Sequence, residues 1–403
     1  MTQKADVVVV GGGPCGSFSA LAAARLGVNV IVCEEHKEIG VPSHCPGHVS
    51  LSGLKRLGLN LPREVVENEI KGAVFYSPSG HEFRVKFASP VICVLNRVLF
   101  DKFLANLAEE AGVRYRLGKR VESLFLDSGQ VKGVFVKEKE VLESNIVIDC
   151  EGCSSTLLKK AGFPTLDKSM VVKGVEAEVD KVEDVNHDTV EVYLGQKYAP
   201  GLFAWIIPRP DGSAKVGLAT KTGNPKTYLQ NFVSHNPKAK YKLRHSRFVS
   251  VSYHPITLGG PLAKTYHDGL LIVGDAASQV KPTTGGGVVM GLNCAKIAGE
   301  TAYEAIKHGD SSAGFLSRYQ RRWRRAIGFD MAVMRQMRLM LNRLPDRRLD
   351  KIIALCSQLH LNEDLKRVRD IDFQGKGIMP IFKSPAAWTV AFYSILLSLT
   401  SPL

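Results

Sequence analysis

Residues 5–16, ADVVVVGGGPCG, decide the fold of this 403-residue chain. The apolar, β-branched run before the glycines predicts a fully buried strand. The alanine-rich residues 17–26 predict a helix that ends at Gly27. Residues 28–33 predict a second buried strand, which ends at Glu34. A dinucleotide-binding unit typically has this order: a strand, a tight glycine turn, a helix, a second strand and a terminal acid.

Each residue type in this unit suits a dinucleotide. Gly11 permits the sharp turn, Gly13 lets the backbone approach a pyrophosphate, and Gly16 lets the helix pack closely on the sheet. Pro14 suits the first helical turn, whose unpaired N–H groups attract a diphosphate. Glu34 is placed to accept hydrogen bonds from an adenosine ribose. The alternative, a glycine-rich turn that binds nothing, does not explain this acid.

A second glycine turn follows a later apolar strand, residues 270–273. Asp275 comes just after that strand, and the triplet 285–287 opens an apolar helix over residues 288–308. Helix-start N–H groups and an acid at the carboxyl end of a parallel strand both favour ligand binding. A plain turn with a capping aspartate is the alternative, and it would be credible if this were the only glycine turn.

Composition limits the class of protein. With 45% hydrophobic and 23% charged residues the chain is ordinary for a globular protein, and its length allows more than one domain. The net charge of +14 favours an anionic partner, namely nucleic acid, a membrane surface or a phosphorylated substrate, although it also serves solubility. Because no nucleic-acid-binding motif occurs, nucleic acid is not expected as a partner.

The cysteines do not follow a metal-binding pattern. Cys150 and Cys153 are the close pair, and no second pair stands at zinc spacing, so no metal site is expected. Scattered cysteines and the lack of a signal-peptide pattern predict a reducing, cytoplasmic compartment.

The loop over residues 41–48 is dense in turn formers and carries the reactive side chains of Cys45 and His48. Catalytic groups concentrate on loops that a rigid scaffold positions, so a site near a cofactor is one interpretation. A plain loop with a free thiol and solvated histidines is the other, and the residues themselves leave both open.

The order of these motifs resembles FAD-dependent enzymes of the para-hydroxybenzoate hydroxylase fold group. The shared features are the two glycine turns, Arg97 and the segment 149–155. Within that group the chain resembles the geranylgeranyl reductases, especially the archaeal enzymes that saturate the isoprenoid chains of ether lipids. Residues 200–208, PGLFAWIIP, are similar to the PGxYxWxFP signature of that family, and Cys45-Pro46-Gly47 sits where the family carries its active-site cysteine loop. The resemblance covers residues 5–308.

The resemblance implies FAD as the cofactor. Arg97 would reach the diphosphate or ribityl region through paired donors, and Asp275 would accept from a ribityl hydroxyl. Residues 285–287 would place N–H groups beside the flavin pyrimidine. The full set expected to bind FAD is Gly11, Gly13, Cys15, Gly16, Glu34, Glu35, Arg97, Glu151, Gly152, Asp275, Pro282, Gly285, Gly286 and Gly287.

The resemblance also implies a reaction, the addition of a hydride and a proton across the isolated double bonds of a prenylated lipid. That chemistry needs a dry apolar pocket. Phe203 and Trp205 would line the pocket, whereas Cys45 and His48 would shape it or relay the proton. These four residues are the expected catalytic set.

Departures from the family pattern and rival functions remain. Phe203 stands where the signature has Tyr, which removes a hydroxyl, and Ile207 stands where it has Phe. Glu151 replaces the usual Asp and keeps its charge. The same motifs occur in flavin monooxygenases and halogenases, and a non-catalytic flavoprotein that binds lipid or carries electrons is a further alternative. The external electron donor is open between ferredoxin, a deazaflavin and NAD(P)H.

The predicted architecture is α/β, with a Rossmann-type FAD-binding domain, an inserted antiparallel β-sheet substrate domain and a helical C-terminal region. The FAD-binding domain is expected over residues 1–70, 96–169 and 256–308. The substrate domain is expected over 170–255 with a contributing hairpin at 71–95, and the helical region over 309–403. Residues 98–111 predict an amphipathic helix whose apolar face carries Leu99, Phe103, Leu107 and Ala111.

The C-terminal region carries two candidate membrane features. Residues 318–325, RYQRRWRR, predict a basic helix, which is either a solvated face or a contact with phosphate or membrane. The apolar run 386–399 is too short to span a bilayer. It either lies in the membrane interface, with Trp388 and Tyr393 as interface-seeking aromatics, or packs on the body. We expect peripheral association with an anionic membrane surface.

Overall fold

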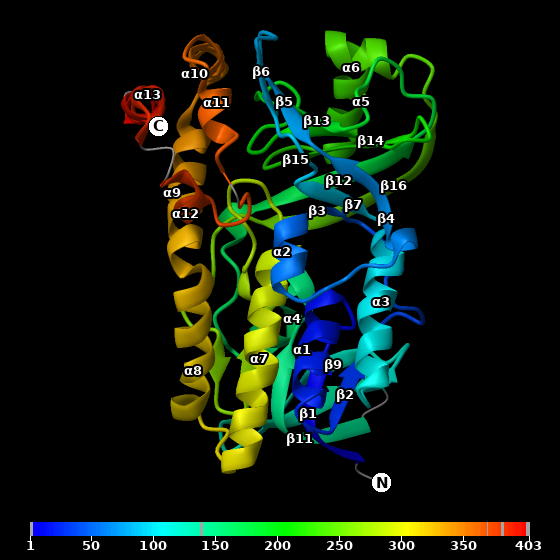
Figure 1. Ribbon diagram of the computed structural model, residues 1–403. Helices are drawn as coiled ribbons and strands as arrows, with labels where there is room; N and C mark the ends of the chain where they lie inside the picture. The colour runs from blue at the N-terminus through cyan, green and yellow to red at the C-terminus, as the bar shows by residue number, and fades with distance from the viewer. Residues whose placement is uncertain (1–2, 138–139, 369, 380–382, 400–403) are drawn as a thin grey trace.

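The computed structural model describes residues 3–137, 140–368, 370–379 and 383–399, and their strands form three sheets (Figure 1). The eight-stranded sheet with its helices occupies the lower half of Figure 1, and the seven-stranded sheet occupies the upper half. The predicted fold class, a Rossmann-type domain with an added sheet and a helical C-terminal region, is confirmed.

The eight-stranded sheet has the order β17-β18-β11-β1-β2-β8, with the β9–β10 hairpin joined to β11. Its strands are β1 (Gln3–Val10), β2 (Val30–Cys33), β8 (Arg114–Arg116), β9 (Val121–Asp127), β10 (Gln130–Val136), β11 (Glu140–Asp149), β17 (Tyr266–His267) and β18 (Leu270–Ile272). β1 pairs in parallel with β2 and β11, and β11 pairs in parallel with β18. Because these central strands are buried on both faces, their sequences are continuous apolar runs.

Three helices cover one face of this sheet: α1 (Pro14–Ala24), α3 (Arg97–Glu110) and α7 (Val288–His308). The β9–β10 hairpin and α4 (Thr156–Lys160) cover the other face. The short helices η3 (Gly152–Ser154) and η5 (Gly274–Ala277) follow β11 and β18 and lead the chain away from the sheet edge.

The buried face of α3 is wider than the predicted one. Phe100, Leu104 and Ala108 are buried, whereas Leu99 is 36% exposed. Phe103, Leu107 and Ala111 of the predicted face are partly buried and pack against the same core. Docking on the sheet therefore buries two adjoining apolar stripes, the deeper of which starts one residue later than predicted.

The seven-stranded sheet has the order β16-β12-β15-β14-β13-β5-β6. Its strands are β5 (Gly72–Tyr76), β6 (Glu82–Lys86), β12 (Val171–Val179), β13 (Thr189–Tyr193), β14 (Ala204–Pro208), β15 (Ala214–Thr220) and β16 (Phe248–Thr257). All neighbours are antiparallel except β13 and β5. The register sets Val192, Trp205 and Gly217 side by side on one face. The opposite face is covered by α5 (Pro225–His235) and α6 (Pro237–Lys242), which the sequence analysis did not single out.

A three-stranded sheet is formed by β3 (His48–Ser50), β7 (Ile92–Leu95) and β4 (Val66–Ile70). The helices α2 (Leu51–Arg56) and η1 (Arg63–Val65) connect its first two strands along the chain. The end of the segment 71–95 thus pairs in this small sheet and not in the seven-stranded one. The domain boundaries as a whole stay a prediction.

The C-terminal region is helical, and it runs along one side of both larger sheets (Figure 1). Its helices are α8 (Ala313–Trp323), η6 (Arg324–Gly328), α9 (Phe329–Arg343), α10 (Asp346–Gln358), α11 (Leu361–Leu365), α12 (Gln374–Ile378) and α13 (Pro385–Leu399). None of the described helices combines the length and the apolar character that crossing a bilayer requires.

Candidate FAD and substrate site

The first glycine turn has close backbone contacts on one side and open space on the other. A Cβ at Gly16 would lie 1.8 Å from the Gly11 carbonyl oxygen. A Cβ at Gly13 would have nothing of the described chain within 4 Å apart from its own neighbours, and no side chain caps α1. The start of α1 is therefore open, which fits the diphosphate of a bound dinucleotide.

Glu34 stands at the edge of this turn. Its Oε2 accepts a hydrogen bond from the Gly12 N–H at 2.7 Å, and its Oε1 accepts one from the His36 N–H at 2.9 Å. The parallel register of β1 and β2 brings this carboxylate to the position where a dinucleotide ribose binds in such units. Glu35 instead is exposed and pairs with Arg120 at 3.5 Å, so the structure does not bring its side chain to the turn.

The second glycine turn lies at the same sheet edge because β18, β11 and β1 run in parallel. A Cβ at Gly287 would lie 2.9 Å from Asp275 Oδ1, so this glycine lets α7 start against the carboxyl group. Cys153 Sγ donates to Asp275 Oδ2 at 3.5 Å, and burial raises the pKa of Asp275. Gly285 has a φ of +76°, which side-chain-bearing residues rarely adopt.

Arg97 begins α3 and is held by Asp101 one turn later. Its Nε and Nη2 donate to the two carboxylate oxygens at 3.0 and 2.9 Å, and its side chain is 13% exposed. This bidentate pair fixes the plane of the guanidinium group beside Cys45.

A buried lysine holds the Cys45 loop. Lys215 Nζ, on β15, donates to the Pro46 carbonyl at 3.1 Å and to the Leu95 carbonyl at 3.2 Å. The same atom pairs with Glu67 Oε2 at 2.7 Å. Gly47 has a φ of +72°, and a Cβ there would lie 2.2 Å from the Leu95 carbonyl oxygen. The loop therefore packs closely on β7, and Lys215 connects it to the seven-stranded sheet.

A largely apolar cavity of about 670 Å³ joins the Cys45 loop, the second glycine turn and the seven-stranded sheet. All four residues predicted to be catalytic line it, as do the glycines of the second turn. Its apolar side chains come from the sheet and from the C-terminal region, and include Phe75, Val85, Val190, Val192, Leu194, Ile207, Met337, Leu341, Leu349, Leu365 and Ile371. Such a lining suits a long hydrocarbon chain.

Two imidazoles supply buried polar atoms in this cavity. His48 Nε2 and His254 Nδ1 are buried and have no hydrogen-bond partner within the described chain. Burial lowers the pKa of each histidine to about 4, so both are neutral at pH 7. His254 was missed by sequence reasoning because a single histidine in a strand carries no motif.

Trp205 is fixed at the cavity wall from two sides. Its Nε1 donates to Glu176 Oε2 at 3.3 Å, and a Cβ at Gly217 would lie 2.5 Å from its ring. Phe203 meets the indole edge to face at a centroid distance of 6.1 Å. Burial raises the pKa of Glu176 to about 7. Gly217 and Glu176 thus set the orientation of Trp205, and neither was predicted.

Comparison with known proteins assigns the family. Residues 4–331 match the family described as FAD binding domain. Digeranylgeranylglycerophospholipid reductase 2 of Methanothermobacter thermautotrophicus is 37% identical to this chain over 362 residues, which cover 87% of this chain and 91% of that protein. The chain belongs to the digeranylgeranylglycerophospholipid reductase family. FAD as cofactor and FAD-dependent oxidoreductase as enzyme class, both predicted, are thereby confirmed.

A solved structure of a similar protein agrees with this family. A geranylgeranyl bacteriochlorophyll reductase-like protein from Thermoplasma acidophilum superimposes with a TM-score of 0.86 and 26% identity, over 98% of this chain and 100% of that one. A flavin-dependent brominase has a TM-score of 0.73 at 19% identity, with 98% and 99% covered. That second likeness shows a shared fold and nothing further.

Two residues expected to bind FAD have other contacts in this reductase-family chain. The Cys15 thiol packs against Gly274 and Gly291, where α1 crosses α7, and burial raises its pKa. The carboxylate of Glu151 accepts hydrogen bonds from the N–H groups of Thr156 and Leu157 and so caps α4. Their side chains therefore act within the protein scaffold.

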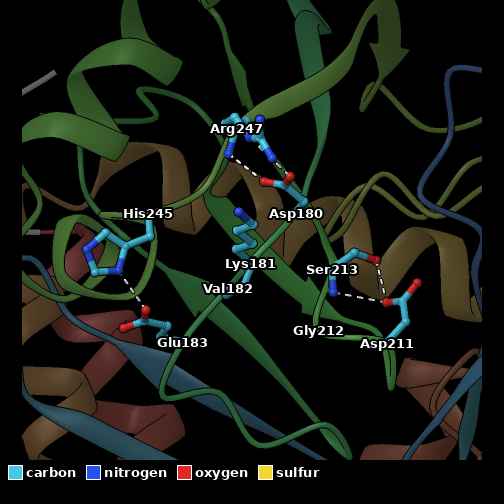
Figure 2. A pocket seen from close by; sticks show the side chains of 9 residues that line it. All are labelled: Asp180, Lys181, Val182, Glu183, Asp211, Gly212, Ser213, His245 and Arg247. Atoms are coloured by element: carbon cyan, nitrogen blue, oxygen red, sulfur yellow. Dashed lines mark hydrogen bonds and ion pairs between the residues drawn. The ribbon is translucent and has the colours of Figure 1, made fainter.

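A second hollow, of about 970 Å³, lies in the loops that follow β12 and precede β15 and β16 (Figure 2). Two of its polar pairs are His245 with Glu183 at 2.7 Å and Arg247 with Asp180 at 3.4 Å. It shares no lining residue with the cavity beside the glycine turn, so the family chemistry does not belong there.

Proposed function

We propose that this protein saturates the carbon–carbon double bonds of geranylgeranyl chains in ether phospholipids or their precursors. The observation that supports this most is the apolar cavity, which reaches from the second glycine turn to Phe203 and Trp205. Membership of the reductase family agrees with it.

The residues of the chain divide the work as follows. Bound FAD, once reduced by an external donor such as ferredoxin, a deazaflavin or NAD(P)H, supplies the hydride that an unactivated alkene needs. The apolar side chains of the cavity exclude water and align the prenyl chain. The second carbon of the double bond needs a proton, and Cys45 and His48 are the cavity residues that would relay it.

Anaerobic turnover tests the reaction. Dithionite-reduced protein incubated with a geranylgeranyl phospholipid should give products that are heavier by one H₂ for each reduced bond, as measured by mass spectrometry. Oxidised protein without a reductant is the control. Recovery of unchanged lipid, together with oxygen-dependent hydroxylation or halogenation of an aromatic compound, would instead assign the chain to the monooxygenase or halogenase function.

The proposal includes peripheral contact with an anionic membrane through α13. Its exposed face carries large apolar side chains, among them Phe392 at 69% exposure and Ile395 at 45%. The opposite face packs on α9, α10 and α11, and α10 and α11 contribute cavity wall. A lipid chain that leaves the bilayer at α13 would therefore reach α10 and α11, the helices that separate α13 from the cavity.

Charge on the neighbouring elements fits an anionic surface. Arg343, Arg347, Lys351 and Lys383 are exposed. Two of the acids nearby are engaged by the protein itself: Asp346 accepts from the Gln196 N–H, and Asp350 from the Ser77 hydroxyl. Glu363 on α11 is exposed and pairs with Lys366 at 2.7 Å. Each exposed cation near anionic lipid contributes about 1 kcal/mol.

The proposed membrane surface differs in two parts from the one expected from the sequence. The segment 318–325 lies roughly 35–40 Å from the start of α10 along the helical column, and its Trp323 is buried. It therefore does not share a surface with α13. Tyr393 is half-buried, so Phe392 takes the place expected for it.

Vesicle flotation tests this contact. The double variant Phe392→Ser/Ile395→Ser should lower binding to anionic vesicles on the order of 100-fold, because roughly 3 kcal/mol of apolar burial is lost. Val249→Ser, equally exposed on β16, is the matched control and should bind like the unmodified protein. Equal flotation of both variants, or binding that added salt does not weaken, would contradict the proposal.

A further inference from the structure

Arg338 is a buried guanidinium that joins three segments of the chain. It lies on α9 and is 3% exposed. Its Nε donates to the Pro282 carbonyl at 2.8 Å, and its Nη2 donates to the Thr283 carbonyl. Its Nη1 donates to the Gly201 carbonyl at 3.3 Å and to the side-chain oxygen of Asn342 at the same distance. One side chain thus connects the second glycine turn to the loop that precedes β14.

All of these partners are neutral. Within the described chain no carboxylate lies at ion-pair distance from Arg338, and burial lowers its pKa to about 10. The group still carries a full positive charge at pH 7. The other cation that lines the cavity, Lys281, differs because Asp372 Oδ1 neutralises it at 2.7 Å.

An uncompensated buried charge is unusual, because burial disfavours the charged form unless an anion accompanies it. Arg338 lines the same cavity as residues 285–287. Reduction of FAD takes up two electrons from the external donor and one proton, so the reduced cofactor carries one negative charge more than the oxidised one. Reduction of FAD would therefore place a negative charge in the same cavity as the unpaired positive charge of Arg338.

We propose that Arg338 is a positioning residue that holds the turn at residues 282–283 and favours the reduced, more negative state of FAD. This inference rests on the proposed placement of the flavin beside residues 285–287. It requires no lipid, so its failure and failure of the reductase proposal are separate results.

The reduction potential of bound FAD tests the inference. Arg338→Met should shift the two-electron potential downward by at least about 30 mV, the equivalent of a tenfold loss of preference for the reduced state. Arg338→Lys keeps the charge and should retain most of the potential, while its poorer hydrogen-bond geometry weakens FAD retention. Both are measured by anaerobic titration against redox dyes.

Arg335→Met is the matched control. Arg335 lies one turn earlier on α9, is exposed, and also donates to a carbonyl, that of Gly259 at 2.9 Å. Its loss should leave the potential unchanged. If Arg338→Met does not fold, Arg338→Gln removes the charge and keeps amide donors, and should show the same downward shift. An unchanged potential in a folded, charge-free variant, or an equal shift in the Arg335 variant, would overturn the inference.

Discussion

Gly13→Val is expected to give a folded protein that no longer retains FAD. The new side chain enters open space at the start of α1, so it meets no protein atom that must move. It occupies the space assigned to the diphosphate and blocks close approach to the helix N–H groups. Loss of two hydrogen bonds to a charged diphosphate costs about 3 kcal/mol or more, on the order of 100-fold in affinity. Flavin fluorescence after denaturation, with circular dichroism of the intact protein, measures both results.

Substitutions at two other glycines serve as controls for Gly13→Val. Gly314→Val lies in the first turn of α8 with only Ser312 Oγ near its Cβ position, and it should keep FAD. Gly16→Val should fail to fold, because its Cβ position lies 1.8 Å from a backbone oxygen. Full FAD retention by folded Gly13→Val would mean that the cofactor binds elsewhere.

Lys215→Met is expected to destabilise the protein by about 3 kcal/mol and to loosen the Cys45 loop. The variant removes one partner of a buried ion pair and leaves the Pro46 and Leu95 carbonyls without their donor. Breaking such a pair costs 3–5 kcal/mol as a rule, and we expect about the lower end because Arg209 still pairs with Glu67 at 3.2 Å.

Urea unfolding measures the stability, and the rate of Cys45 alkylation, followed by peptide mass spectrometry, measures the freedom of the loop. Cys45 should react faster in the variant. Lys226→Met, on the exposed side of α5, is the control and should change neither quantity. If the two variants unfold at the same urea concentration and Cys45 reacts at the same rate in both, Lys215 does not hold the loop.

Local sequence determined a large part of the fold. The predicted helix over 288–308 and the observed α7 have the same bounds. Glycine, β-branched runs and helix formers act through backbone sterics within a few residues, so such elements can be predicted without tertiary information. The dinucleotide-binding motif is equally local, because the turn, the helix start and Glu34 lie in one unit.

The assembly of the candidate site was decided by tertiary structure. His254, Lys215 and Arg338 reach the cavity region from strands and helices that lie far from Cys45 in the chain, and none belongs to a motif. Their place depends on strand order and helix docking, which sum many weak long-range contacts. The same holds for α3, where docking on the sheet decides which apolar residues are buried most deeply.

Side-chain roles divide in the same way. By itself the sequence indicated the dinucleotide-binding βαβ unit, because this unit depends on residue types at short fixed spacings, and its resemblance to a known family implied FAD and the reductase reaction. Only the tertiary structure showed that Glu151 caps a helix, that Cys15 packs between helices and that Phe392 is more exposed than Tyr393. The direction of a side chain is set by the neighbours that pack around it, and those neighbours come from other parts of the chain.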